Sequence, residues 1–445
     1  MSTQSTPSVR QRTNRLTMLA IASALTCLAT SASAHSLGDL LQAARQYDAT
    51  YLGAQQQYQA NLAKAEQSKS LLLPTVGLSA SSTRTSTQSD PGVNEYAYNT
   101  NSATVSASQP LYNPSNKASY DQAKIQLISS QAQLNAAEQD LIVRVAQAYF
   151  DALASQDSLS YVQAQKKAVA EQLASAKRNF EVGTATITDS KEAQSRYDLV
   201  VAQELAAQND LEIKTLALRQ LVGIADAQPD PISNTLPTAE GDMQAWIDKA
   251  MQQHPTLQQL QIAEQVAKLE TEKARAGHKP TVSLTGSYTM ADAVDGTSSK
   301  SFGGTTVHNK NASIGVSVSI PLYSGGSTQN RIKETLALED KAHDDVLAAQ
   351  RSISQNVRSA YLGLTSGLSQ VKAEASSQSS LESNQVGYRV GVRINIDVLN
   401  AQSQLYSTKS SLAQARYNVL MTSLKLKQAV GVLTTEDALK LSPKP

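Results

Sequence analysis

Histidine, cysteine and acidic side chains carry most protein chemistry, and in this chain they are scattered. No two histidines have the i, i+4 spacing of a helical metal pair; they stand at positions 35, 254, 278, 308 and 343. The sequence contains neither a Walker-type glycine-rich loop nor a Gly-x-Ser-x-Gly elbow. The acidic pair Asp344-Asp345 falls on a predicted helix surface, where a solvated face is the expected role. We therefore expect no metal site, no cofactor and no enzymatic activity.

The charge and composition of the chain exclude further classes of function. Its 445 residues include 39 basic and 38 acidic side chains, so no basic surface for nucleic acid is expected. Aromatic residues make up 4% and apolar residues 40%, which is little material for one large globular core. An extended architecture built from small and polar residues fits this composition better.

The first 34 residues have the pattern of a cleaved secretory signal peptide. Three arginines precede an apolar run from Leu16 to Ala29, and the small residues Ala32-Ser33-Ala34 follow. The alternative, a short membrane anchor, needs roughly 20 apolar residues, more than this run supplies. The only cysteine, Cys27, lies inside the signal, so we expect neither a lipid anchor nor a disulfide in the mature chain.

The mature sequence repeats itself after about 208 residues, a spacing estimated from several ordered matches. These matches are Pro110-Leu111-Tyr112 with Pro321-Leu322-Tyr323, Ala148-Tyr149 with Ala360-Tyr361, Val182-Gly183 with Val390-Gly391, Ala193-Gln194-Ser195 with Ala401-Gln402-Ser403, and Val222-Gly223 with Val430-Gly431. We expect a first repeat over 35–229, a link that joins an outer collar over 230–242, a second repeat over 243–431 and a tail over 432–445.

Each repeat carries long helical patterns. Apolar residues recur every three or four positions from Leu134 to Ala152, and the same steps return 212 residues later from Val346 to Leu364. Such a stripe predicts packing against another helix at coiled-coil geometry. The predicted helices are Ser36–Leu72, Ser115–Val182, Asp189–Gly223, Met243–Gly277, Gly326–Gly387 and Asp397–Gly431. Each repeat is thus a long helix antiparallel to two shorter stacked helices.

Four short runs alternate apolar with serine or threonine residues, which predicts strands. They cover Val76–Ala80, Ala103–Ala107, Val282–Met290 and Ile314–Ile320, joined in pairs by the polar loops Thr87–Asn101 and Ala291–Asn311. Soluble hairpins are the alternative. If the strands lie in lipid, four cannot close a barrel, whereas three chains supply twelve. The expected fold class is mainly α: a long antiparallel coiled-coil helical barrel, with four transmembrane strands per chain completed as a twelve-stranded barrel in a trimer.

Nearly the whole mature chain resembles the TolC family of outer-membrane channels. The most specific matching residues are Ala148-Tyr149-Phe150, Asp157, Leu159-Ser160-Tyr161, Phe180, Val182-Gly183, Ile187-Thr188-Asp189, Tyr197-Asp198, Leu218-Arg219-Gln220 and Gly223 in the first repeat, and Gly387-Tyr388, Val390-Gly391, Arg393, Asp397-Val398-Leu399, Leu405-Tyr406 and Ala415-Arg416-Tyr417-Asn418 in the second.

The resemblance implies a homotrimeric channel in the Gram-negative outer membrane, with a helical tunnel projecting into the periplasm. It implies export of small molecules or proteins together with a periplasmic adaptor, also called a membrane fusion protein, and an inner-membrane ABC or proton-driven pump. The barrel would face outer-membrane lipid. Two other functions stay open from the residues alone: a periplasmic coiled-coil scaffold without a pore, and a general diffusion porin, against which so much helix argues.

The resemblance also assigns gate residues at the helix turns. Arg393 would bond Thr188 and Asp189, and Tyr388 would reach Asp189, although Asp189 and Asp397 also suit helix N-caps. The family lines its constriction with two carboxylate rings; here Asp397 keeps the first and Asn400 replaces the second. We therefore expect weaker cation preference. Gln385, opposite Gln172, stands where glutamate is expected, so this link would be neutral.

Adaptor docking in the family uses the turns between the long helices. Here these turns are Val182-Gly183-Thr184 and Val390-Gly391-Val392, which differ from the usual Val-Gly-Leu and leave the cognate adaptor open. The glycine of each turn also has a structural role, because it adopts backbone conformations that other residues resist.

Overall fold

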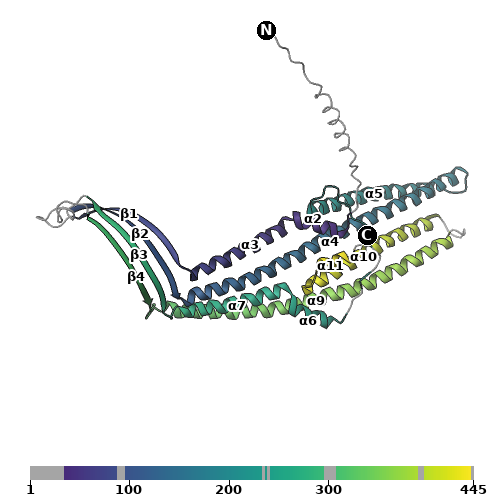
Figure 1. The fold of residues 1–445 in the computed structure, drawn as a ribbon. Coiled ribbons are helices and arrows are strands. Elements are labelled where there is room, and N and C mark those ends of the chain that lie inside the picture. The colour runs from purple at the N-terminus through teal and green to yellow at the C-terminus, as the bar shows by residue number, and fades with distance from the viewer. Residues whose placement is uncertain are drawn as a thin grey trace, which may run out of the picture.

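The protein is an elongated bundle of helices with an antiparallel sheet at one end (Figure 1). The computed structural model describes residues 35–87, 96–232, 236–237, 241–294, 307–388 and 395–441. The signal peptide expected over 1–34 lies outside these residues, as do 442–445 of the predicted tail. None of the helices in the described ranges combines the length and apolar content needed to cross a bilayer.

Two long helices run from the sheet to the opposite end, which we call the tip. They are α4 (Pro114–Glu181) and α9 (Ser327–Tyr388). The 68 residues of α4 extend about 100 Å at 1.5 Å per residue. The helices α5 (Ile187–Val222) and α10 (Asn395–Val430) return from the tip and pack along α4 and α9, respectively. This confirms the predicted antiparallel pairs.

The predicted helices 36–72 and 243–277 are each interrupted. The first consists of α2 (Leu37–Tyr47), α3 (Ala49–Lys69) and the 3-10 turn η2 (Ser70–Leu72). The second consists of α6 (Met243–Gln253) and α7 (Pro255–Ala276). The breaks have local causes: Asp48 caps α3 by accepting from the Tyr51 N–H, and Pro255 lacks the N–H that would continue α6.

The sheet has the strand order β1-β2-β3-β4, with every neighbouring pair antiparallel. Its strands are β1 (Thr75–Thr87), β2 (Tyr96–Tyr112), β3 (Thr281–Val294) and β4 (Val307–Ser319). They are longer than predicted, so the predicted polar loops were too long: residues 96–101, 291–294 and 307–311 are strand. Polar side chains in these segments bond across the strand pairs: the Ser82 hydroxyl donates to the Asn101 Oδ1 at 2.7 Å. The alternation of apolar and polar residues did not predict this extension of the strands.

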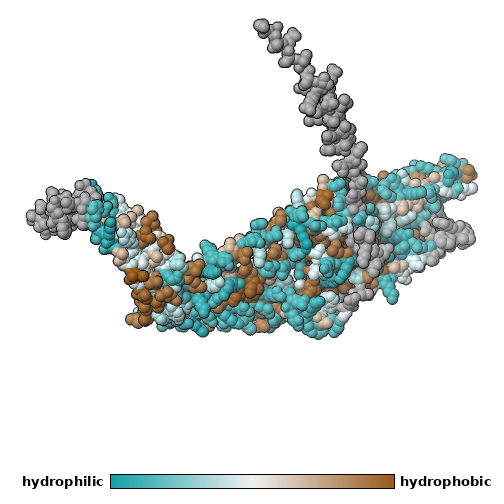
Figure 2. Space-filling model, in the orientation of Figure 1, coloured by the Kyte–Doolittle hydropathy of each residue, from teal (hydrophilic) through white to brown (hydrophobic). Residues whose placement is uncertain are grey.

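Strand register separates the two faces of the sheet. Leu78 pairs with Val105, and Val105 pairs with Tyr288, so one face carries these apolar side chains and all three are exposed. Hydroxyl groups on the other face bond across strands, with Thr104 3.0 Å from Thr289 and Ser287 2.9 Å from Ser313. Figure 2 shows hydrophobic residues gathered on the part of the sheet nearest the helices.

The largest buried clusters lie in the middle of the bundle, which we call the equator. One cluster joins α2, α4, α5, α10 and the short helix α11 (Thr435–Leu439), and includes Leu41, Tyr149 and Phe150. A second joins α6, α7, α9 and α10 around Val357 and Leu426. The predicted apolar stripe lies in these clusters: Leu141, Val145 and Ala152 are fully buried in one, and Val346, Ile353, Val357 and Leu364 lie in the other.

Candidate functional site: the tip of the helical bundle

The turn after α4 is shaped by one glycine and one asparagine carbonyl. Gly183 has a φ of 77°, in the left-handed region that favours glycine. The Asn179 carbonyl oxygen accepts from the Thr184 N–H at 2.8 Å and from the Thr184 hydroxyl at 3.0 Å. Val182 is 72% exposed, and no atom lies within 4 Å of a Cβ placed on Gly183. The Val182-Gly183-Thr184 turn is therefore a bare surface at the extreme tip.

Asp189 belongs to a capping box at the start of α5. The Thr186 hydroxyl accepts from the Asp189 N–H, and the Asp189 carboxylate accepts from the Thr186 N–H at 3.0 Å and from its hydroxyl at 2.8 Å. These hydrogen bonds hold the pKa of the Asp189 carboxyl below its ordinary value. The expectation that Asp189 is itself the N-cap is corrected: Thr186 is the N-cap, and Asp189 is the third helical residue.

The structure describes only part of the predicted gate. Thr188 is exposed and Gln172 is half-buried. Arg393 and the second docking turn, Val390-Gly391-Val392, lie outside the described residues. The side chains of Tyr388, Gln385 and Asp397 also lie outside the description. Because α10 begins at Asn395, Asp397 is its third residue rather than its N-cap.

Asn400 has a partner that the sequence did not suggest. Arg196, on α5, donates from Nη2 to the Asn400 Oδ1 at 3.0 Å. Asn400 is exposed and Arg196 is half-buried. Farther from the turns, Gln165 of α4 donates to the Ser403 hydroxyl of α10 at 3.4 Å. Polar side chains thus join the α4/α5 pair to the α9/α10 pair near the tip.

A stronger junction between the two pairs lies closer to the equator. The Tyr417 hydroxyl of α10 donates to the Asp157 carboxylate of α4 at 2.8 Å, and the Tyr417 ring stacks on Phe150 with centroids 6.2 Å apart. Burial and the neighbouring carboxylate raise the pKa of Tyr417 well above its ordinary value, so its hydroxyl stays a donor. Asp157 and Tyr417 are each part of the predicted family motifs, but their sequence separation hid the pairing.

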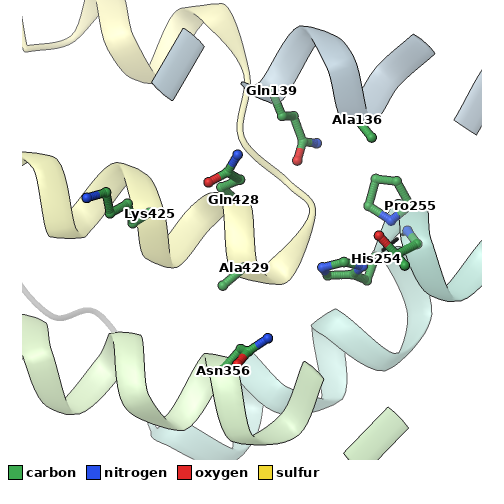
Figure 3. Close-up of a pocket in the computed structure, with 9 residues that line it drawn as sticks. Ala136, Gln139, His254, Pro255, Asn356, Lys425, Gln428 and Ala429 are labelled. Carbon is green, nitrogen blue, oxygen red and sulfur yellow. Dashed lines mark hydrogen bonds between the residues drawn. The ribbon is translucent and has the colours of Figure 1, made fainter. Parts of the chain in front are cut away.

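A cavity of about 320 Å³ opens between α4, α7, α9 and α10 at the equator (Figure 3). Its lining residues are Ala136, Gln139, His254, Pro255, Thr256, Asn356, Lys425, Gln428 and Ala429. The lining contains no carboxylate and no thiol. Burial lowers the pKa of His254, whose Nδ1 accepts from the Thr256 N–H at 3.2 Å, so the ring is neutral and caps α7. The described residues contain no cluster of histidine, cysteine or carboxylate side chains that could hold a metal ion.

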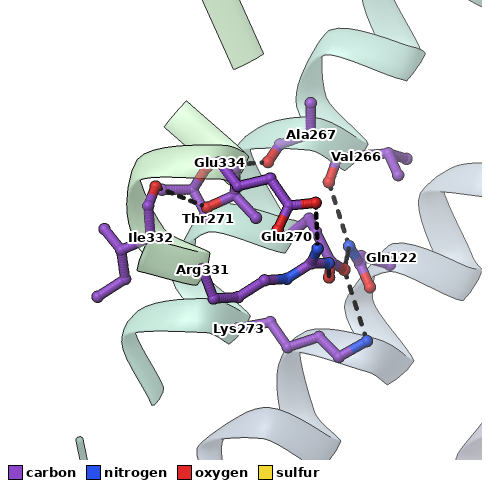
Figure 4. A network of polar contacts seen from close by, with 10 residues as sticks. Gln122, Val266, Ala267, Glu270, Thr271, Lys273, Arg331, Ile332 and Glu334 are labelled. Carbon is purple, nitrogen blue, oxygen red and sulfur yellow. Dashed lines mark hydrogen bonds and ion pairs between the residues drawn. The ribbon is translucent and has the colours of Figure 1, made fainter. Parts of the chain in front are cut away.

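A polar network ties the helices together beside the sheet (Figure 4). Glu270 of α7 accepts from Gln122 of α4 at 3.0 Å and from Arg331 of α9 at 2.8 Å. Lys273 lies 3.5 Å from the same carboxylate. The hydrogen bond from Gln122, with the two cations, holds the pKa of Glu270 below its ordinary value. The network therefore joins α4, α7 and α9 through one carboxylate.

Comparison with known proteins agrees with this architecture. The sequence matches the outer membrane efflux protein family over residues 40–224 and 246–432. It is 32% identical over 439 residues to the outer membrane protein TolC of Vibrio cholerae, covering 96% of this chain and 98% of that protein. It is 30% identical over 352 residues to the alkaline protease secretion protein AprF of Pseudomonas aeruginosa, covering 76% and 71% of the two chains.

The fold is also that of a solved outer membrane protein, VceC from Vibrio cholerae. The two superpose with a TM-score of 0.75 at 17% sequence identity, over 89% of this chain and 96% of that one. The matched relatives are channel proteins rather than enzymes, and the scaffold alternative is not favoured. The chain therefore belongs to the outer membrane efflux protein family and is an efflux and secretion channel of the Gram-negative outer membrane.

Proposed function

We propose that three copies of the chain form one continuous duct, in which their sheets close a twelve-stranded barrel. The observation that carries this proposal is the sheet itself. Its register places exposed apolar side chains such as Val76, Leu78 and Ile314 on one face and bonded hydroxyls on the other, the pattern of a strand between lipid and water. Open sheet edges are not tolerated in lipid, and closure by two further copies removes them.

The helices would continue the barrel as a tunnel through the periplasm. In the trimer, α4, α5, α9 and α10 of each copy would lie side by side, with the equator held by the buried clusters. The repeats over 35–229 and 243–431 would each supply one strand pair and one set of helices, joined by the link 230–242. The duct has no chemistry of its own, so energy comes from its partners.

The partners would be a periplasmic adaptor and an inner-membrane ABC or proton-driven pump. The relative AprF is named for alkaline protease secretion, and the matching family is named for efflux, so we propose both protein and small-molecule cargo. The exposed turn around Val182 and Gly183, with Phe180 and Ile187 also exposed, presents apolar surface at the tip. We assign adaptor docking to this turn and to its counterpart Val390-Gly391-Val392.

The tip would also hold the gate and the constriction. Three copies of Asp397, with Asn400 one helical turn further on, would line the narrowest point. Arg393, Thr188, Asp189 and Tyr388, with the neutral pair Gln172 and Gln385, would close it. Exposed polar contacts contribute only about 0–1 kcal/mol each, so a docking partner can release several together.

Single-channel recording of the purified, detergent-solubilised mature protein in a planar bilayer tests the proposal. Small, cation-preferring current steps that lose this preference in Asp397→Asn would support a closed-tip duct with Asp397 at its constriction. Folded protein that never inserts, or that washes off native membranes in alkali, would refute the barrel and restore the scaffold interpretation.

A further inference from the structure

The link between Arg196 and Asn400 places a permanent positive charge at the proposed constriction. The guanidinium of Arg196 cannot lose its proton in a protein, and its Nη2 lies 3.0 Å from Asn400 Oδ1. Among the described residues it has no carboxylate partner that would cancel this charge. Arginine side chains usually pair with carboxylates or stay in water, so a guanidinium held by a neutral amide leaves a net charge at a defined place.

The position of this charge follows from the helix geometry. Asn400 and Asp397 are three residues apart in α10, which is about 4.5 Å along the helix axis at 1.5 Å per residue. The guanidinium at Asn400 is therefore within about one Debye length of the Asp397 position at physiological salt. A threefold axis would repeat both charges three times around the duct.

The Asn400 side chain also accounts for the position of the Arg196 guanidinium along the bundle. Arg196 starts from α5, whereas Asn400 belongs to α10, and α4 packs along both helices. Arg196 is half-buried, so its stem is held by the surrounding helices while its head reaches the exposed amide. A hydrogen bond with a charged donor is stronger than a neutral one, which favours this single placement of the guanidinium.

We propose that Arg196 is a specificity-determining residue of the channel: held by Asn400 while the tip is closed, it offsets the Asp397 ring and lets anionic cargo reach the constriction. The inference rests on the proposed function, because it assumes that Asp397 and Asn400 line the narrowest point. Charges at a narrow, low-dielectric passage act strongly on the ions that cross it. The cargo class is solutes with exposed carboxylate, sulfonate or phosphate groups, which an uncompensated carboxylate ring would repel.

Reversal potentials in a KCl gradient give the ratio of potassium to chloride permeability and test the inference. Arg196→Gln removes the charge and is expected to raise this ratio by about twofold or more. Arg196→Lys keeps the charge and should stay within the wild-type range. Arg351→Gln removes an exposed arginine of α9 at the equator, away from the tip, and should match the wild type.

Asp397→Asn, measured in parallel, separates failure of the inference from failure of the proposed function. If Asp397→Asn lowers the ratio and Arg196→Gln leaves it unchanged, the constriction stands and the role of Arg196 is refuted. If neither variant changes the ratio, the constriction lies elsewhere and both ideas fall. If Arg196→Gln yields no channels, Arg196→Lys still tests the inference. Because this variant keeps the charge, a roughly twofold rise in its ratio of potassium to chloride permeability would overturn the inference.

Discussion

The equator and the tip of the helical bundle are stabilised by different kinds of interaction. At the equator, large side chains such as Tyr149, Phe150 and Leu424 are almost completely buried. Toward the tip, the described apolar clusters shrink to Val169 with Val200, and Leu173 with Ala176 and Ala193. Polar contacts such as Arg196–Asn400 join the helix pairs there instead. A packed equator resists movement, whereas a tip joined by exposed polar bonds can separate without opening a core.

The largest predicted effect comes from emptying the equatorial core. Phe150→Ala removes a ring that is 1% exposed and stacked on Tyr417, and should lower the free energy of unfolding by about 3–5 kcal/mol. Val200→Ala, in a tip cluster, should lower it by only about 1–2 kcal/mol. Thermal denaturation followed by circular dichroism compares the two. Equal losses of stability would contradict the division between equator and tip.

The next effect concerns the ion pair that joins α3 to α4 at the equator. Arg144 contacts the Asp48 carboxylate through both terminal nitrogens, at 2.8 and 3.0 Å, and Asp48 is only 8% exposed. Arg144→Gln leaves that carboxylate largely buried without its cation, at a cost of about 2–3 kcal/mol after allowing for the partial exposure of Arg144. Denaturant unfolding at pH 7 measures the loss. Lys341→Gln, which removes the exposed ion pair with Asp345, is the control and should leave the free energy of unfolding unchanged.

Acid should remove the stabilisation that the ion pair between Asp48 and Arg144 contributes. The hydrogen bond from Arg144 holds the pKa of Asp48 below its ordinary value. A depressed carboxyl pKa contributes stability above the unfolded-state pKa of about 3.9, and this contribution is lost as pH falls through the lower folded-state pKa. The stability gap between wild type and Arg144→Gln should therefore narrow below about pH 4. A gap that is constant from pH 7 to pH 3 would exclude an electrostatic origin.

A smaller effect is expected beside the sheet. Glu270→Gln keeps the size of the side chain but weakens its bonds to Gln122 and Arg331, which should cost about 1 kcal/mol. Raised salt should reduce the difference between Glu270→Gln and the wild type, because screening weakens the ion pairs of the wild type. Unfolding at low and high KCl checks this. A salt-independent difference would mean that packing, rather than charge, carries the joint.

The smallest effect on stability should come from the tip turn. Gly183→Ala meets no neighbour within 4 Å, so its only cost is the left-handed backbone, about 1 kcal/mol. Global unfolding should scarcely change, because the turn is remote from the core. If the turn docks the proposed adaptor, the free energy of adaptor binding, measured on immobilised channel, should fall by more than the free energy of unfolding. Loss of the folded protein in this variant would place the tip within the cooperative core.

Sequence patterns predicted the elements that depend on periodicity. The stripe from Leu134 to Ala152 predicted α4 and its packing, and alternation at Val76–Ala80 predicted β1. The helix breaks were not predicted, because they depend on single residues rather than on periodicity. Asp48 and Pro255 divide helices whose apolar pattern is continuous. The Arg196–Asn400 and Asp157–Tyr417 contacts join residues 204 and 260 positions apart, so no spacing rule reveals them.

Thiol bridging during single-channel recording tests most directly whether the tip opens against a fixed equator. Residues 35–445 contain no cysteine, so Arg196→Cys/Asn400→Cys can be joined by a short, cleavable bifunctional reagent. Lys427→Cys/Asp437→Cys, which replaces an equatorial ion pair at 2.7 Å, is the matched control. We predict that bridging the tip abolishes transitions to large conductance, that cleaving the bridge restores them, and that the equatorial bridge changes nothing. Large openings that persist with the tip bridged would contradict this account.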